Sequence, residues 1–234
     1  MLVVSATELW RAKHPGAVIG LLEVSGVDNT RAYAPLDSRK REIEARLRER
    51  YRGFVRRDFL ALPVMSAYER YYKRFDKTYH VLLQLESIVL KGRNLPNVSP
   101  LVDANFMAEV DTLVLTAGHD AARLQEPVSI DAARSGDEMI QMNGAPKAML
   151  AGDMVMRDAA GLSCSILYGQ DNRSPISAAT THALYVAYAP AGVPANAVEA
   201  QLEAIEANIR LFSPEMVVEQ RQLLPSDRPY ADPG

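Results

Sequence analysis

The sequence predicts an α+β domain in which antiparallel or mixed sheets pack against helices. Two observations predict it. Helical periodicity dominates the first half of the chain, and short alternating segments with tight turns follow it before one more helical segment. The chain shows no regular strand–helix–strand repetition. Its 234 residues, 48% of them hydrophobic, can bury a substantial core as one large domain or two small ones.

The N-terminal segment predicts one short helix and one buried strand. The strand covers the apolar run at 18–24 (VIGLLEV), which is partly β-branched and lies between Gly16 and Ser25-Gly26. The helix follows Thr7 and ends before Pro15, where the restricted backbone usually stops a helix. Nothing in this segment specifies catalysis.

Residues 37–51 (DSRKREIEARLRERY) form the clearest predicted helix. Ile43, Leu47 and Tyr51 give it a narrow apolar stripe, and Gly53 follows as a stop. Its arginines fit either phosphate contact or a charged solvent-exposed face, because Glu42–Arg46 and Glu44–Arg48 have the spacing of favourable helix pairs. The candidate RNA contacts are Arg46, Arg48, Arg50 and Arg93.

Charge is unevenly distributed along the chain, although the net charge is only -3. Residues 31–93 hold 16 basic and 8 acidic side chains, which leaves 10 of the 26 basic and 21 of the 29 acidic residues for the rest. A basic N-terminal third on an acidic body suits an anionic partner that touches one face. The alternative is a set of solvated helix faces.

Residues 56–77 interleave aromatic and basic side chains. Such a mixture can stack on bases and neutralise phosphates. The aromatic residues also fall at helical spacing, which favours an apolar face packed in the core; these are Tyr68, Tyr71, Tyr72 and Phe75. Residues 79–90 predict another amphipathic helix.

The second half predicts strands, then a helix and a tail. Strands are expected at 128–133, 152–158, 162–168 and 183–189, with a tight turn at Asn143-Gly144. Residues 195–212 predict a long helix. Residues 223–234 contain three prolines without periodicity and are expected to form a flexible tail.

The stretch 90–120 has the features of a pocket wall. A loop rich in turn formers leads into a segment that begins at Pro100 and carries Asp103 and Asn105 among apolar residues. An apolar run at 113–115 follows and breaks at Ala117-Gly118-His119-Asp120. Polar side chains inside apolar elements, beside a glycine, are typical of a binding site.

Several classes of chemistry lack their motifs. The chain has no glycine-rich phosphate loop and no nucleophile elbow. Its four histidines are scattered, and Cys164 lies in an alternating segment typical of a small core residue. We therefore expect no metal, no cofactor and no covalent nucleophile.

The expected location is the cytoplasm. No apolar run approaches the ~20 residues that a membrane helix needs, so no membrane partner is expected. The N-terminus lacks the pattern of a signal peptide, and a single cysteine fits a reducing compartment.

Four segments, in order, resemble one known family. They are LPNVSPLVDANFMAEV at 95–110, TAGHD at 116–120, the run from Gly136 to Leu167, and ISAATTHALYVAYA at 176–189. Together they resemble the B3/B4 tRNA-binding domain of the phenylalanyl-tRNA synthetase beta chain, and look closest to its freestanding homologues. The resemblance implies one domain over 1–222, with a basic extension (1–78), a core (79–190) and a C-terminal helix (194–212).

In that family, the resemblance implies, a small pocket hydrolyses wrongly attached amino acid from the 3′ end of tRNA. Water is positioned there by pocket groups and the terminal ribose, without a metal. The expected partner is therefore the tRNA acceptor end, or aminoacyl-tRNA, or a free amino acid. By position, the candidate catalytic residues are Asn105, His119, Gln170 and Thr180, and the candidate substrate-binding residues are Asp103, Gly118, Asp120, Gly169 and Asp171.

Two departures from the family pattern affect the expected chemistry. The family's pocket histidine falls at Ala117 here, with His119 displaced by two residues, and its pocket glutamate falls at Gln170, beside Asp171. Three hypotheses follow: an editing hydrolase that acts on mischarged tRNA, a non-catalytic binding module for tRNA, an amino acid or a small metabolite, and an interaction protein with a vestigial pocket.

Overall fold

The computed structural model describes residues 1–30 and 33–227. One sheet has five strands in the order β1-β4-β7-β8-β9, and only its β1–β4 pair is parallel. These strands are β1 (Val4–Ala6), β4 (Val128–Ala132), β7 (Met154–Asp158), β8 (Gly161–Ser165) and β9 (Gly169–Gln170).

A second sheet is antiparallel throughout and has the order β11-β2-β10-β3. Its strands are β2 (Val18–Ser25), β3 (Thr116–Asp120), β10 (His182–Ala189) and β11 (Val217–Pro225). A separate hairpin joins β5 (Glu138–Ile140) to β6 (Pro146–Ala148). β2 and β10 are almost wholly buried because both faces of their sheet are covered.

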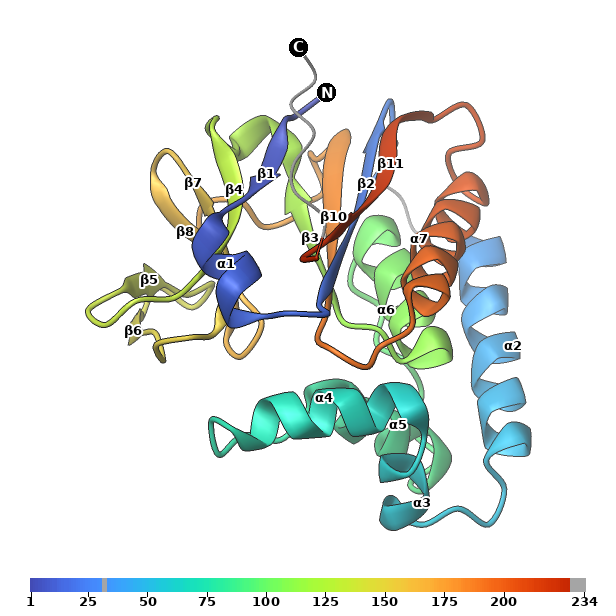
Figure 1. The fold of residues 1–234 in the computed structure, drawn as a ribbon. Coiled ribbons are helices and arrows are strands. Elements are labelled where there is room, and N and C mark those ends of the chain that lie inside the picture. Colours follow the sequence, from blue (N-terminus) through green and yellow to red (C-terminus); the bar gives the residue numbers. More distant parts are fainter. Residues whose placement is uncertain (31–32, 228–234) are drawn as a thin grey trace.

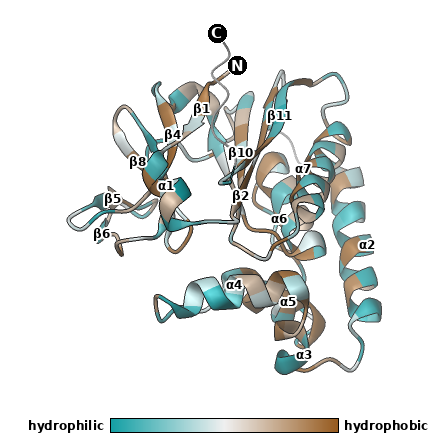
Figure 2. Cartoon of the chain, in the orientation of Figure 1, coloured by the Kyte–Doolittle hydropathy of each residue, from teal (hydrophilic) through white to brown (hydrophobic). Residues whose placement is uncertain are grey.

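The helices pack against both sheets. They are α1 (Glu8–Lys13), α2 (Ala34–Arg50), α3 (Arg56–Leu60), α4 (Pro63–Lys73), α5 (His80–Val89), α6 (Pro100–Thr112) and α7 (Ala195–Arg210), with a short 3-10 turn, η1 (Ala121–Arg123). Helix α1 packs on β4 of the first sheet, and α7 packs on β2 of the second. In Figure 1, α6 and α7 lie between the second sheet and α2, and α3–α5 lie together below them. Much of α2 is hydrophilic in Figure 2, as expected for the outermost helix.

The predicted α+β class is confirmed, and so is the buried strand at the N-terminus. The tyrosines of α4 face the core, as the helical spacing favoured: Tyr68, Tyr71 and Tyr72 are at most 3% exposed. Tyr68 stacks on Tyr79 with ring centroids 4.2 Å apart. Their apolar area therefore stabilises the packing of α4 against α5.

Two segments differ from what the local sequence pattern suggested. The apolar run 113–115 spans the end of α6, because Leu113 ends that helix in a left-handed conformation (φ 67°) and β3 begins only at Thr116. Leu223–Pro225, expected in a flexible tail, pairs with β2 in β11, while residues 228–234 lie outside the described residues. The sequence pattern missed β11 because its mixed composition does not alternate.

The N-terminal segment takes part in both sheets. β1 pairs with β4, and β2 lies between β10 and β11, so the first 25 residues contribute strands to both sheets. Strand pairing over this sequence distance cannot be inferred from local composition.

Candidate functional site

A pocket of about 430 Å³ lies where α5, α6, β3 and β10 meet the end of the five-stranded sheet. Its wall is largely apolar, with Phe106, Leu115, Ile176 and Tyr185 among the lining side chains. Polar groups reach it from several elements; these are His80, Gln84, Asn105, Glu109, Thr116, Ser165, Gln170 and Tyr188. An apolar pocket with a few convergent polar groups is the usual form of a small-molecule site.

Glu109 is the acidic side chain of this wall, and sequence reasoning missed it. It follows Asn105 by four residues on α6, so both side chains lie on one helix face. Burial raises the pKa of Glu109 to about 8, while hydrogen bonds from the Thr116 amide and Asn105 act in the opposite direction. The Thr116 amide lies 2.8 Å from Glu109 Oε1. Around neutral pH, this carboxyl therefore exists in both protonation states.

One polar atom of the lining residues, Gln84 Oε1, is buried without a hydrogen-bond partner among the described residues. The Tyr188 hydroxyl instead contacts the Cys164 thiol. Asn105 is better satisfied, because its Nδ2 donates to the Thr116 carbonyl at 2.8 Å. A buried polar atom without a partner costs free energy. Gln84 Oε1 is therefore a candidate for contact with a ligand.

The lining residues include no permanently charged cation. Burial lowers the pKa of His80 from its ordinary value, so its imidazole is neutral near pH 7. Burial also raises the pKa of Cys164 to about 12, which keeps its thiol protonated and unreactive. Ser165 Oγ donates to Asp153 and accepts from the Tyr168 amide at 3.1 Å.

The pocket contains four of the nine residues predicted for catalysis and substrate binding: Asn105, Gly118, Gly169 and Gln170. Gln170 donates its side-chain amide to the Gly118 carbonyl, which joins β9 to β3 across the pocket wall. At Gly118 a Cβ would lie 2.8 Å from Ile176 and 2.9 Å from Tyr185. Glycine at this position therefore keeps two pocket walls close together.

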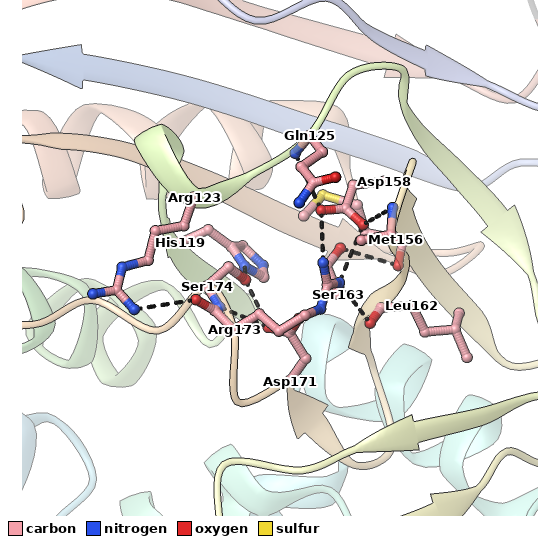
Figure 3. Close-up of polar contacts among 11 residues, drawn as sticks. His119, Arg123, Gln125, Met156, Asp158, Leu162, Ser163, Asp171, Arg173 and Ser174 are labelled. Carbon is pink, nitrogen blue, oxygen red and sulfur yellow. Dashed lines mark hydrogen bonds and ion pairs between the residues drawn. The ribbon is translucent and has the colours of Figure 1, made fainter.

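His119 and Asp171 do not line the pocket; they lie in the buried network of Figure 3. Asp171 Oδ1 accepts from the Ser174 hydroxyl at 2.7 Å, and Ser174 Oγ lies 2.8 Å from His119 Nδ1. Arg173 joins Asp171 (2.8 Å) to Asp158 (3.1 Å). Burial lowers the pKa of His119 to about 3, so the imidazole is neutral.

Asp103, Asp120 and Thr180 also make contacts outside the pocket. Asp103 is buried and pairs with the equally buried Lys40 at 2.6 Å, tying α6 to α2. Asp120 Oδ2 accepts from the Thr180 hydroxyl at 2.8 Å, and its other oxygen accepts from the Ala122 amide. Each of these carboxylates is satisfied by the fold itself.

The predicted RNA-binding arginines lie along α2 and the following loops. Arg46 pairs with Asp111 at 2.6 Å. Arg48 donates to the carbonyls of Ile88, Gly92 and Arg93 at 2.9–3.3 Å. The Arg50 guanidinium lies 5.2 Å from the ring centroid of Tyr51, and Arg93 is exposed. Arg46 and Arg48 therefore hold α2 against its neighbours, and their contact with RNA stays a prediction.

Within residues 1–30 and 33–227, no three or more His, Cys, Asp or Glu side chains are grouped so that they could hold a metal ion. None of the helices in this part of the chain has both the length and the apolar character needed to cross a membrane.

Comparisons with known proteins yield structural neighbours but no sequence relative. No protein-family model and no curated protein sequence matches the chain. A similar solved structure is an N-terminal fragment of the phenylalanyl-tRNA synthetase beta-subunit from Pyrococcus horikoshii, with a TM-score of 0.48 and 8% sequence identity. The match covers 95% of this chain and 50% of the fragment, so the chain spans about half the length of that fragment. Similarity at this level does not place the chain in the synthetase family.

Proposed function

We propose that this protein binds an aminoacyl group, attached to the 3′ end of a tRNA, in the pocket beside Glu109. The observation that carries the proposal is the charge of the lining: one carboxyl, Glu109, and a neutral His80. A ligand ammonium complements a buried carboxylate, because the pair satisfies a charge that would otherwise be costly. The resemblance of four ordered segments to a tRNA-binding domain also supports the proposal.

The charged groups of the pocket lining also favour an aminoacyl ester over a free amino acid as the ligand. Both carry an ammonium, but the free amino acid also carries a carboxylate. With no cation in the lining, that carboxylate would be desolvated without a partner. An ester or amide has a neutral carbonyl instead. The apolar side chains around Leu115, Ile176 and Tyr185 then remain to contact the amino-acid side chain.

Calorimetry tests the proposal with amides as stable mimics of the ester. We expect the protein to bind amino-acid amides with an affinity roughly tenfold or more above that for the corresponding free amino acids. The compounds to compare are leucinamide, phenylalaninamide and tyrosinamide. Glu109→Gln, which keeps the shape but loses the charge, is expected to weaken binding by about 2 kcal/mol or more. An amide series without measurable binding, or with binding unaffected by Glu109→Gln, would show the proposal to be wrong.

The protonation of Glu109 adds a second readout. A bound ammonium stabilises the carboxylate and lowers its pKa from about 8. Below pH 8, binding should therefore release a proton, and the measured enthalpy should depend on the ionisation enthalpy of the buffer. Above about pH 9 Glu109 is already ionised, whereas the α-amine of the free amide is neutral and takes up a proton on binding, so release should give way to uptake. Glu109→Gln should abolish the release.

Hydrolysis of the bound ester is a second candidate, favoured by the pKa of Glu109. In its ionised form the carboxylate can accept a proton from water, whose oxygen bonds to the ester carbonyl carbon. The bond to the ribose 3′ oxygen then breaks, and that oxygen takes a proton. The expected kcat/KM rises with pH up to about 8, where Glu109 of the unliganded protein becomes ionised. Deacylation no faster than background across a panel of mischarged tRNAs would leave binding alone.

Variants separate the groups that face the pocket from those behind it. Asn105→Ala, in the pocket wall, should reduce deacylation directly. Thr180→Val removes a hydroxyl that is bonded to Asp120 outside the pocket, so its effect should appear in stability first.

A further inference from the structure

Two lysines flank one tyrosine at the edge of the pocket. Lys77 Nζ lies 5.6 Å and Lys147 Nζ 4.6 Å from the ring centroid of Tyr168. The two come from distant parts of the chain, the segment between α4 and α5 and strand β6. Figure 1 shows these segments on the same side of the molecule. The fold therefore brings two ammonium groups to one half-buried ring.

Tyr168 is joined to the pocket by its backbone. Its amide donates to Ser165 Oγ at 3.1 Å, and both Ser165 and the next residue, Gly169, line the pocket. Both lysines are also close in sequence to residues that line the pocket. Lys77 precedes the lining residue His80 by three positions, and Lys147 is on the hairpin whose Met142 also lines the pocket.

The charges of Lys77 and Lys147 are not neutralised by a carboxylate within the described part of the chain. Nearby Lys73 differs, because it pairs with Glu69 at 3.1 Å. A cation–π contact orients an ammonium but leaves its N–H donors available. Two such groups at the pocket edge form a site suited to an anion with several acceptor oxygens.

We propose that Lys77 and Lys147 bind a backbone phosphate of the RNA 3′ end whose aminoacyl group occupies the pocket. The inference rests on the proposed function and assigns the surface that recognises the RNA. Phosphates are the dominant anions near an aminoacyl ester, and lysines bind them as point charges. The arginines of α2 fit this role less well, since Arg46 and Arg48 already contact Asp111 and backbone carbonyls.

Binding of a minihelix RNA carrying phenylalanine as a 3′ amide, measured between 50 and 200 mM salt, tests the inference. In the double variant Lys77→Ala/Lys147→Ala, the slope of log K against log salt should become less steep by about 1.4. Each lost contact with a single-stranded phosphate contributes ~0.7 to that slope. The affinity for phenylalaninamide should stay within about twofold of the wild-type value, since the pocket interior is untouched.

Two control pairs carry the same loss of charge. Lys13→Ala/Lys91→Ala removes two exposed lysines, one from α1 and one from the loop after α5, and Arg46→Ala/Arg50→Ala removes two arginines of α2. Both pairs should leave the slope nearly unchanged. A larger fall for the arginine pair than for the Lys77/Lys147 pair would move the RNA surface to α2 and overturn the inference.

The remaining outcomes distinguish this inference from the proposed function. An unchanged slope in the Lys77/Lys147 variant, with binding still lost in Glu109→Gln, would overturn the inference and leave the pocket proposal standing. Failure of the wild-type protein to bind both RNA and amide would overturn both. If inorganic phosphate competes with the RNA equally well in wild type and variant, the phosphate site lies elsewhere and the inference is wrong.

Discussion

The pocket wall and the buried network behind it use similar polar side chains in different ways. In the network, Asp171 contacts Ser174 and Arg173, and Asp158 accepts two bonds of 3.1 Å from Arg173. In the wall, Gln84 Oε1 has no hydrogen-bond partner among the described residues. The difference indicates which polar groups stabilise the fold and which remain available to a ligand.

His119 is an exception in the buried network, because one of its ring nitrogens has no hydrogen-bond partner among the described residues. Its Nδ1 lies 2.8 Å from Ser174 Oγ, but its Nε2 is buried without a partner in the described chain. The neutral ring tolerates this more easily than an imidazolium would, because desolvation penalises the charged form. His119 therefore belongs to the network by its contacts, although one nitrogen is unsatisfied.

The largest expected effect comes from breaking the network. Asp171→Ala removes the acceptor of Ser174 and leaves the Arg173 guanidinium with one carboxylate fewer. We expect a loss of about 3 kcal/mol or more in the free energy of unfolding, as for other buried pairs that lose one partner. Urea denaturation measures it. Asn172→Ala, at the exposed neighbour, should change stability by under about 0.5 kcal/mol; equal effects of the two variants would contradict the structural role.

The next effect concerns pH and His119. Its pKa is lowered to about 3 in the folded protein, so the unfolded chain binds more protons between pH 6.5 and 3. Stability must therefore fall as the pH decreases through this range. His119→Asn lacks this dependence, and acidification from pH 7 to 4 should cost it roughly 3 kcal/mol less than wild type. Parallel urea titrations at both pH values check this difference; identical losses would mean that His119 titrates normally.

The smallest effect tests the geometry of the pocket. In Gly118→Ala the new methyl group would lie 2.8 Å from Ile176 and 2.9 Å from Tyr185, so both walls must move. Overpacking of this kind costs about 1–3 kcal/mol. Amide binding should weaken as well.

Gly20→Ala is the matched control for Gly118→Ala. Its Cβ would lie 2.6 Å from Val198, in the packing of β2 against α7 and away from the pocket. It should destabilise the protein without changing amide affinity. If both variants weaken amide binding equally, the effect of Gly118→Ala is not local to the pocket and the structural role given to Gly118 is wrong.

Local pattern predicted most of the elements but not their partners. The 3.6-residue spacing of Tyr68, Tyr71 and Tyr72 correctly favoured a buried helix face. Thr7, named before the first helix, does cap it by accepting from the Trp10 amide. β11 was missed because its identity as a strand depends on pairing with β2, almost 200 residues earlier in the sequence.

The candidate site was predicted in part. Four of the predicted residues line the pocket: Asn105, Gly118, Gly169 and Gln170. Asp103 does not line it, because its side chain is buried between α2 and α6 and is neutralised there by Lys40. Glu109 was overlooked, although its spacing of four residues from Asn105 placed it on the same face of α6. A glutamate in a helix is usually solvent-exposed, so only its burial singles it out.

By itself, the sequence determined the α+β class, most helices and strands, and the stretch that contains much of the pocket wall. These features follow from periodicity, turn formers and helix stops, which act over a few residues. The tertiary structure alone decided which polar side chains face the pocket, which are neutralised inside the fold, and that Lys77 and Lys147 meet at Tyr168. The physical reason is that burial and pairing, which set the pKa of Glu109 and the partners of Asp103 and Asp171, arise between residues far apart in the chain.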